Sequence, residues 1–271
     1  MPRMAGPLAP SAVVTGAARG FGKEIARRLV ARGHRVLITD VDAEAVAAAA
    51  AELGAGCTGI VADARSAADH RRAADAAAEL GPVTAWVNNA GVLRAGKVWE
   101  LAEDDVAGQV EVNLLGVVHG SRAAVEAMRG RGGHLLNIAS MSAHGPVPGL
   151  AVYAATKAAV LSFTTSLAGE LALAGLPIRA HALCPDAADT ALVRGERAHA
   201  DTAILFSRPT LLTADAVADA AVALLAGRRI VRSLPPARGG LAKIGGLLPV
   251  VGLPVLARLR ARGERRRVAA P

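Results

Sequence analysis

The sequence predicts a single α/β domain with a doubly wound parallel sheet of about seven strands. Three observations lead to this prediction. The chain has 271 residues, enough for one large domain, and 52% of them are apolar, enough for a full core. Short apolar runs also alternate with longer helical stretches along most of the chain. Runs this apolar are expected to be buried on both faces, so helices should cover both sides of the sheet through right-handed crossovers.

The predicted elements alternate regularly. Strands are expected at residues 12–15, 35–39, 57–62, 84–88, 133–139, 178–184 and 229–233. Helices are expected near residues 21–32, 43–53, 66–80, 103–129, 151–174 and 213–226. This order is typical of a Rossmann-type fold. We expect that domain to cover residues 1–233, followed by a basic, apolar extension at 234–271.

The turn after the first strand has the composition of a phosphate-binding loop. The stretch VVTGAARGFGKEIARRL places Gly16, Gly20 and Gly22 between a strand and a helix, with Arg19 and Phe21 among them. Glycines allow positive φ and a close approach of the backbone to a pyrophosphate, and the helix amino terminus attracts anions. The spacing is G-x-x-x-G-x-G and differs from the usual G-x-G-x-x-G, so a plain tight turn is the alternative. We expect all five residues to bind a dinucleotide.

The ends of the second and third strands carry acids that bear on the cofactor. Asp40 ends the second strand, where a carboxylate can accept hydrogen bonds from ribose hydroxyls and repel a 2′-phosphate. Arg19 favours the opposite choice, since a guanidinium can bind a 2′-phosphate. We expect NAD rather than NADP because the repulsion by Asp40 is direct. Asp63 and Ala64, after the third strand, are expected beside the adenine, although Asp63 could equally cap the next helix.

Polar residues follow the fourth and fifth strands. The fourth strand ends in NNAG, residues 88–91, and the fifth ends in LLNIAS with Ser140. Because the carboxyl ends of parallel strands line the ligand crevice, a serine hydroxyl here can donate to a substrate oxygen. Asn113 lies among apolar neighbours in the helix between these strands, where its amide requires partners.

The only tyrosine of the chain precedes a lysine by four residues. Tyr153 and Lys157 belong to YAATK, in a predicted helix, so they share one face. A cation within roughly 4–6 Å can lower the pKa of a phenol from ~10 by ~1–3. Such a phenol can exchange protons near neutral pH. A surface tyrosine beside an incidental lysine is the alternative.

Together these motifs resemble the short-chain dehydrogenase/reductase family. The resemblance rests on TGAARGFG at 15–22, Asp40, NNAG at 88–91, Asn113, Ser140 and YAATK at 153–157. It covers roughly residues 11–226. It implies a Rossmann-type fold and an oxidoreductase that transfers a hydride between NAD(H) and an alcohol or ketone.

The resemblance also implies residue roles. Tyr153 exchanges a proton with the substrate oxygen, Lys157 tunes it and holds the nicotinamide ribose, and Ser140 orients the substrate. Asn113 holds a water molecule next to Lys157. The remaining expected cofactor contacts flank the adenine ribose or the nicotinamide: Asn89, Ala90, Gly91, Pro185, Ala188 and Thr190.

Two stretches depart from the family pattern. The stretch CPDAADT has Asp186 where a glycine is usual, and we expect the aspartate to tolerate a left-handed backbone there. The loop at 187–212 is expected to close over the substrate as an apolar lid, or else to anchor on the core. His144, Val147 and Leu150 are further candidates to line the pocket, with a structural role favoured for the histidine.

The excess of basic over acidic residues lies in the carboxy-terminal part of the chain. Residues 228–271 contain 11 of the 31 Lys and Arg residues and a single acid, Glu264. A nucleic-acid-binding domain would spread cations over a docking face, so nucleic acid is not an expected partner. Prolines and glycines interrupt the apolar stretch 241–259 too often for a transmembrane helix. Contact with an anionic membrane surface, packing on the body or another subunit, and disorder remain alternatives.

The sequence therefore predicts an NAD-dependent oxidoreductase for a hydrophobic secondary alcohol or ketone. An NADP-dependent ketone reductase of a biosynthetic pathway and a non-catalytic NAD-binding scaffold are the alternatives. No Cys/His set has metal-ligand spacing, so no metal is expected. The two cysteines are expected to be reduced, and the amino terminus has no signal-like apolar run, which favours a cytoplasmic protein with membrane-peripheral contact as an alternative. The family resemblance implies a homodimer or homotetramer.

Overall fold

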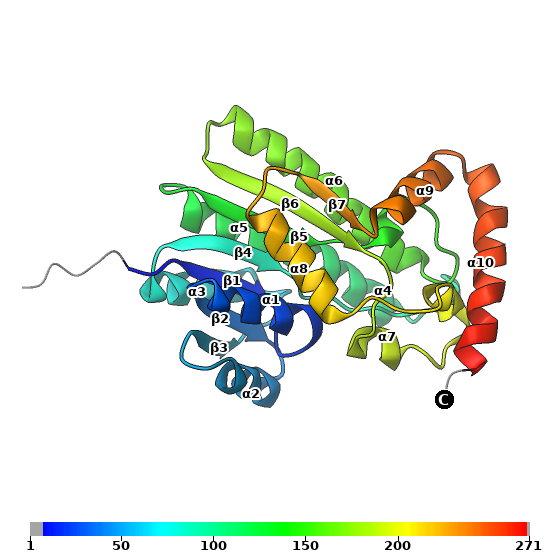
Figure 1. The fold of residues 1–271 in the computed structure, drawn as a ribbon, viewed down its shortest axis with the longest axis horizontal. Helices are drawn as coiled ribbons and strands as arrows, with labels where there is room; N and C mark the ends of the chain where they lie inside the picture. Colours follow the sequence, from blue (N-terminus) through cyan, green and yellow to red (C-terminus); the bar gives the residue numbers. More distant parts are fainter. Residues whose placement is uncertain (1–7, 270–271) are drawn as a thin grey trace, which may run out of the picture.

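A seven-stranded parallel sheet forms the centre of the protein in the computed structural model, which describes residues 8–269 (Figure 1). The strand order is β3-β2-β1-β4-β5-β6-β7, so the chain reverses direction across the sheet between β1 and β4. The strands are β1 (Ser11–Thr15), β2 (Arg35–Asp40), β3 (Cys57–Val61), β4 (Val83–Asn88), β5 (Gly133–Ile138), β6 (Ile178–Pro185) and β7 (Val231–Leu234). The predicted doubly wound fold is confirmed, and its switch point lies where ligands bind in such sheets.

Helices follow each strand. They are α1 (Gly20–Ala31), α2 (Ala43–Leu53), α3 (Ala67–Leu80), α4 (Glu103–Val110), η1 (Glu111–Leu115), α5 (Gly116–Met128), η2 (Met141–His144), α6 (Ala151–Leu173), α7 (Ala191–Gly195), η3 (Ala200–Phe206), α8 (Ala214–Leu225), α9 (Pro236–Leu247) and α10 (Pro249–Ala269).

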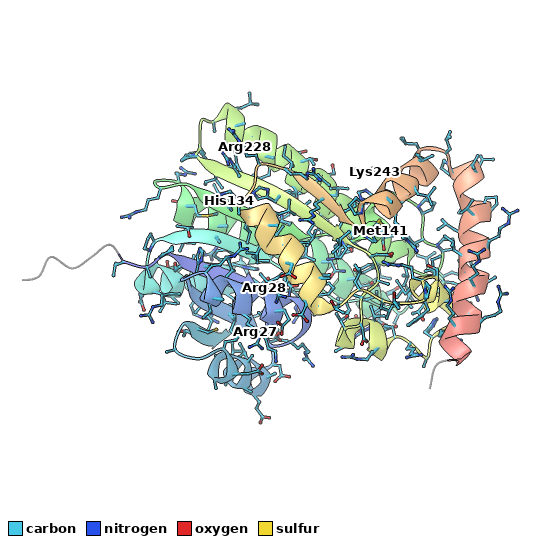
Figure 2. All side chains as sticks on the ribbon, in the orientation of Figure 1. Arg27, Arg28, His134, Met141, Arg228 and Lys243 are labelled. Atoms are coloured by element: carbon cyan, nitrogen blue, oxygen red, sulfur yellow. The ribbon has the colours of Figure 1, made fainter. Side chains whose placement is uncertain are left out.

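The strands alternate their side chains between two cores, which is why they are apolar throughout. On β1, Ala12 and Val14 pack with α1, α2 and α8 on one face of the sheet. Val13 points to the other face, where it packs with α3, α5 and α6. On the first face, Arg28 of α1 also reaches Asp215 and Asp219 of α8 at 2.9 and 2.6 Å (Figure 2).

The helix expected at 103–129 is interrupted. α4 ends at Val110, a π-helical turn (η1) spans Glu111–Leu115, and α5 continues from Gly116. The wider turn contains Asn113, whose side chain is fully buried and bonded to the chain after β4. Such π turns are frequent at functional sites.

The carboxy-terminal extension is helical and packs on the body. Pro236 and Pro249 occupy the first positions of α9 and α10, where a missing N–H has no cost. α9 contacts η2 and β7, and α10 lies along η3 beyond the carboxyl edge of the sheet (Figure 1). Among residues 8–269, no helix is long and apolar enough to cross a membrane.

Two sets of side-chain contacts hold α10 against the loop at 187–212. Arg260 binds the buried carboxylate of Asp201 in η3. Arg267 donates to the backbone oxygens of Arg197 and Ala198 at 3.0 and 3.1 Å. The loop at 187–212 is therefore held between the body and the extension rather than standing alone.

Candidate active site

The turn after β1 requires glycine at particular positions. Gly16 and Gly20 have φ angles of +60° and +58°, in the left-handed region. A Cβ on Gly16 would lie 2.6 Å from the Cα of Ala90, and one on Gly22 would lie 2.6 Å from the side-chain nitrogen of Asn89. Gly22 thus serves packing, whereas Gly16 and Gly20 line a cavity.

The amino terminus of α1 opens onto this cavity without a side-chain cap. Arg19 precedes the helix and makes no capping hydrogen bond, and the first turn has no acid. Gly20 and Phe21, the first residues of the helix, both line the cavity. The helix end can therefore receive an anionic group such as a pyrophosphate.

Asn89 holds the turn from behind. Its side-chain nitrogen donates to the carbonyls of Thr15 and Gly16 at 3.0 and 2.7 Å. The Thr15 hydroxyl accepts the N–H groups of Asn89 and Ala90 at 3.1 and 3.2 Å. These bonds tie the ends of β1 and β4 together and fix the cavity floor at the switch point.

Asp40 lies where the ribose-binding acid was predicted. Its carboxylate lines the cavity and accepts the N–H of Ala18 at 3.1 Å. Arg19, the competing feature, is 63% exposed and its guanidinium lies 3.5 Å from Asp42. Arg19 also lines the cavity, so both the acid and the arginine lie at this end of the site.

Asp63 has a partner that the sequence analysis did not consider. Arg65 donates to both Asp63 carboxylate oxygens at 2.7–3.1 Å, and this pairing lowers the pKa of Asp63. Both residues line the cavity together with Ala64. The expected adenine end of the cavity thus contains the Asp63–Arg65 ion pair. The sequence could have indicated this pair, because the arginine follows the acid by two residues in DAR.

Asn113 holds the backbone of Val92, in the segment after β4, by two hydrogen bonds. Its side-chain oxygen accepts the N–H of Val92, and its nitrogen donates to the Val92 carbonyl, both at 2.8 Å. The nitrogen also lies 3.3 Å from the Thr156 hydroxyl. Asn113 does not line the cavity, but a Cβ on neighbouring Gly91 would lie 3.2 Å from its oxygen and 3.6 Å from the Lys157 Nζ.

Ser140, Tyr153 and Lys157 come together at one side of the cavity. Ser140 lies just after β5, and its Oγ hydrogen bonds with Ser142 Oγ at 3.0 Å. The Lys157 Nζ donates to the carbonyl of Ile138 at 3.0 Å and lies 5.7 Å from the centre of the Tyr153 ring. α6 places tyrosine and lysine one turn apart on the face that meets the end of β5.

The expected lowering of the Tyr153 pKa is not found in this structure. Burial raises the pKa of Tyr153 to about 12, and the hydrogen bond with Ser140 opposes this only in part. Burial also lowers the pKa of Lys157 to about 8. The prediction was wrong because it weighed the lysine charge but not desolvation, which disfavours both charged forms. The protein alone holds a protonated phenol.

The segment after β6 forms the opposite wall. Pro185, Asp186, Ala188 and Thr190 all line the cavity, and Thr190 caps α7 by accepting the N–H of Val193 at 3.5 Å. No described residue other than glycine has a positive φ, so Asp186 does not occupy the left-handed conformation that the sequence suggested.

Asp186 instead forms ion pairs with two distant arginines. Its Oδ2 lies 3.0 Å from Nε of Arg238 in α9 and 3.7 Å from Nη1 of Arg208. The Asp186 side chain is 11% exposed. Its carboxylate therefore links the end of β6 to the carboxy-terminal extension.

The cavity has a volume of about 580 Å³, within the range of ligand sites. The predicted residues that line it are Gly16, Arg19, Gly20, Phe21, Asp40, Asp63, Ala64, Asn89, Ala90, Gly91, Ser140, Tyr153, Lys157, Pro185, Ala188 and Thr190. Lining residues that sequence reasoning missed include Thr39, Val41, Arg65, Leu93, Met141 and Ser142. Most of these residues are sequence neighbours of a predicted residue, so their position at a strand end could have identified them.

The pocket candidates between Ser140 and Tyr153 have different places. His144 lines neither cavity and lies 2.9 Å from the Ser233 hydroxyl, a structural role. Val147 lines a second cavity. Leu150 is buried against Tyr153 and supports it from below.

Known proteins are similar to this chain in sequence. The short chain dehydrogenase family matches residues 10–201. The 1-deoxy-11-beta-hydroxypentalenate dehydrogenase of Streptomyces avermitilis is 39% identical over 222 residues, which cover 79% of this chain and 80% of that protein. A match to the probable oxidoreductase EphD of Mycobacterium tuberculosis covers 87% of this chain but 43% of that protein, at 34% identity.

Solved structures agree with the fold. A short chain dehydrogenase/reductase from Burkholderia phymatum in complex with NAD has a TM-score of 0.80 and 31% identity, covering 88% of this chain and 94% of that one. A variant of the actinorhodin polyketide ketoreductase with NADPH has a TM-score of 0.78 and 32% identity, covering 87% and 99%. The chain therefore belongs to the short-chain dehydrogenase/reductase family and is an NAD(P)-dependent oxidoreductase that acts on CH–OH groups.

Proposed function

We propose that this protein uses NAD(H) to interconvert a hydrophobic secondary alcohol and its ketone. One observation carries the proposal: a single cavity connects Asp40 and the glycine turn to the cluster of Ser140, Tyr153 and Lys157. The strand order places these groups from one side of the switch point to the other. A dinucleotide can thus be held at one side while a substrate oxygen meets the hydroxyls at the other.

The residues present fit a nicotinamide cofactor. The uncapped end of α1 suits the pyrophosphate, Asp40 suits the ribose hydroxyls, and Lys157 suits the second ribose. When bound, the cofactor accepts or donates the hydride and its oxidised ring adds positive charge.

The protein handles the proton. In reduction, the Tyr153 hydroxyl donates its proton to the ketone oxygen. Burial keeps this phenol protonated before the reaction, and the nearby Lys157 cation favours the phenolate that donation leaves behind. In oxidation, the phenolate takes the proton from the substrate hydroxyl, and the Lys157 cation stabilises it. Ser140 holds the substrate oxygen, and Asn113 keeps the chain beneath Lys157 in place.

The preference for NAD is supported by the surroundings of Asp40. The carboxylate faces the cavity, so a 2′-phosphate would approach a like charge. Arg19 lines the cavity too, but its guanidinium is exposed and lies 3.5 Å from the carboxylate of Asp42. An NADP preference is the competing outcome, and one of the similar solved structures contains NADPH.

The preference for an apolar substrate is supported by the walls near the hydroxyls. Leu93 and Leu205 line the cavity and belong to one apolar cluster with Tyr153, and Met141 directly follows Ser140. Leu192 and Val193 line the cavity as well. Such walls favour hydrocarbon over sugar-like substrates.

Two measurements test the proposal. Titration of protein fluorescence should give a Kd for NADH at least tenfold below that for NADPH. Asp40→Ala should reduce this ratio, whereas Glu44→Ala, which removes an exposed acid of α2 outside the cavity, should leave it above tenfold. Turnover should then be measured with NAD and a series of secondary alcohols of increasing lipophilicity. Tighter binding of NADPH would reverse the cofactor assignment, and tight NADH binding without turnover of any alcohol or ketone would favour a scaffold.

A further inference from the structure

A second cavity of about 250 Å³ adjoins the active site. It shares Met141, Ser142, Asp186 and Leu205 with the main cavity, so the two meet behind the catalytic hydroxyls. Ser142, at the junction, accepts the hydrogen bond of Ser140 at 3.0 Å. The cavity alone is smaller than the ~300–1,000 Å³ of complete ligand sites, so it suits one part of a ligand.

The walls of this cavity are almost entirely hydrocarbon. Most of them come from α9 and α10 of the carboxy-terminal extension, opposite η2 and η3. The charged side chains that line it are Asp186 and Arg238, and they lie 3.0 Å apart. Because they neutralise each other, this second cavity, called the chamber below, offers no unpaired charge to a ligand.

Glycines bring the two helices close enough to form the chamber. A Cβ on Gly252 of α10 would lie 2.5 Å from the Gly245 carbonyl of α9. A Cβ on Gly246 would meet the His144 carbonyl of η2. These backbone contacts hold α9 against α10 near the turn that joins them, and α9 against η2.

The chamber opens at the surface between the same helices. Leu241, Ile244, Leu248 and Val251 line it and yet are 56–62% exposed. An apolar molecule can enter along these side chains, and its far end can reach the main cavity.

We propose that this chamber holds the apolar end of an elongated, lipophilic alcohol or ketone whose reacting carbon lies at Ser140 and Tyr153. The inference rests on the proposed function and adds a substrate class to it. Each methylene that enters the chamber raises kcat/KM by about three- to fourfold until the chamber is filled.

The test measures activity with alcohols of increasing length in two variants, one whose chamber is filled by a new side chain and one whose chamber is unchanged. Ala242→Phe places a ring in the cavity, whereas Ala257→Phe makes the same change on an exposed position of α10 outside it. With alkan-2-ols from butan-2-ol to dodecan-2-ol, the wild type and Ala257→Phe should gain activity with length. Ala242→Phe should keep the activity with butan-2-ol and lose the gain with longer chains. The same length profile in both variants overturns the proposal.

A binding measurement separates failure of this inference from failure of the proposed function. Diphenylhexatriene, a neutral elongated hydrocarbon, should fluoresce in the wild type and be displaced by dodecan-2-ol without any turnover. Ala242→Phe should weaken its binding at least fivefold relative to Ala257→Phe. If no alcohol turns over but this difference in dye binding is found, the chamber binds apolar ligands and the proposed activity is wrong. Equal dye binding by the two variants would contradict the chamber as a binding site.

The turn that joins α9 and α10, next to the opening of the second cavity, carries a second inference. Leu247 and Val250, at the turn between α9 and α10, are 80% and 87% exposed and lie outside both cavities. The turn projects from the body at the end of the helix pair (Figure 1). Exposed apolar residues gathered at one projecting turn indicate a contact surface.

Cations accompany this apolar turn. On α10, the exposed Arg258, Arg262 and Arg265 follow Val251 and Val255 at spacings of three or four residues, so they share one side of the helix. Lys243 is exposed on α9 (Figure 2). Within residues 8–269, none of these four cations forms an ion pair.

We propose that the α9–α10 turn docks on an anionic lipid bilayer. Exposed apolar side chains next to cations that pair with no acid fit the interface between acyl chains and anionic headgroups. A two-fold contact with a second copy would place the same cations against each other, which is unfavourable. Each cation near the surface should strengthen binding on the order of fivefold at low salt.

Vesicle flotation with the full-length protein tests this. Vesicles containing phosphatidylserine should carry the protein, and neutral phosphatidylcholine vesicles should carry much less. Val250→Ser and Lys243→Ala should each reduce the floated fraction, whereas Leu173→Ser, which changes a 92% exposed leucine at the end of α6, should not. Equal flotation of Val250→Ser and Leu173→Ser overturns the proposal. So does a dimer in sedimentation that Val250→Ser dissociates while vesicles never bind.

Discussion

The ion pair between Asp186 and the extension should stabilise the fold measurably. Asp186→Ala leaves Arg238 and Arg208 without the carboxylate that lies 3.0 and 3.7 Å from them. The acid is 11% exposed and the arginines are 32% and 27% exposed, so the pair lies between the surface and fully buried cases. We therefore expect a loss of about 1–3 kcal/mol in the free energy of unfolding. For a domain of this size that lowers Tm by roughly 2–5 °C.

Urea denaturation and thermal scans of four variants measure this. Asp189→Ala is the matched control, because that acid pairs with Arg194 at 2.8 Å while both side chains are 59% exposed, and its loss should stay within about 0.5 kcal/mol. Arg238→Leu combined with Asp186→Ala should cost at least about 1 kcal/mol less than the sum of the single changes. If Asp186→Ala matches Asp189→Ala, or if the double change is additive, the link to α9 does not stabilise the protein.

Two further predictions concern the turn after β1 and a histidine pair. Gly16→Ala should lower the free energy of unfolding by at least about 2 kcal/mol and weaken NADH binding at least tenfold, because its Cβ meets Ala90 at 2.6 Å. Gly33→Ala, at φ +86° with nothing within 4 Å, should cost only the backbone strain of about 1 kcal/mol, and equal effects would refute the packing argument. His134 stacks on His181, and burial lowers the pKa of His134 from 6.5 to about 4, so the unfolded chain binds a proton first. Stability should therefore fall by on the order of 1–2 kcal/mol as pH decreases from about 6.5 toward 4, and His134→Phe should flatten that decline in urea titrations.

Much of the site could be predicted because its residues lie at strand ends. In a parallel sheet these ends meet at one edge, so Gly16, Asp40 and Ser140 had to lie near one another once the strand order was set. Tyr153 and Lys157 needed only the helical period to share a face. Family motifs then pointed to the same positions.

The rest depended on contacts between distant segments and on solvent exclusion. Nothing near Asp186 in the sequence indicates Arg238, because the pair forms only after α9 folds back over the carboxyl edge. The pKa of Tyr153 depends on how deeply the ring is buried, which no local pattern encodes. The second cavity arises where α9 and α10 meet at Gly245 and Gly252, in a stretch for which the sequence left membrane contact, packing and disorder as alternatives.

The central claim is that the Tyr153 hydroxyl carries the proton in an NAD(H)-dependent reaction. Tyr153→Phe removes one oxygen and keeps the ring within its apolar cluster, so NADH binding and stability should stay close to those of the wild type. Steady-state NADH formation with a lipophilic secondary alcohol is the measurement, with NADH affinity determined in parallel. The account predicts a fall in kcat of about 10²–10⁴ with an unchanged Kd for NADH. A variant that turns over within a few-fold of the wild type would contradict it.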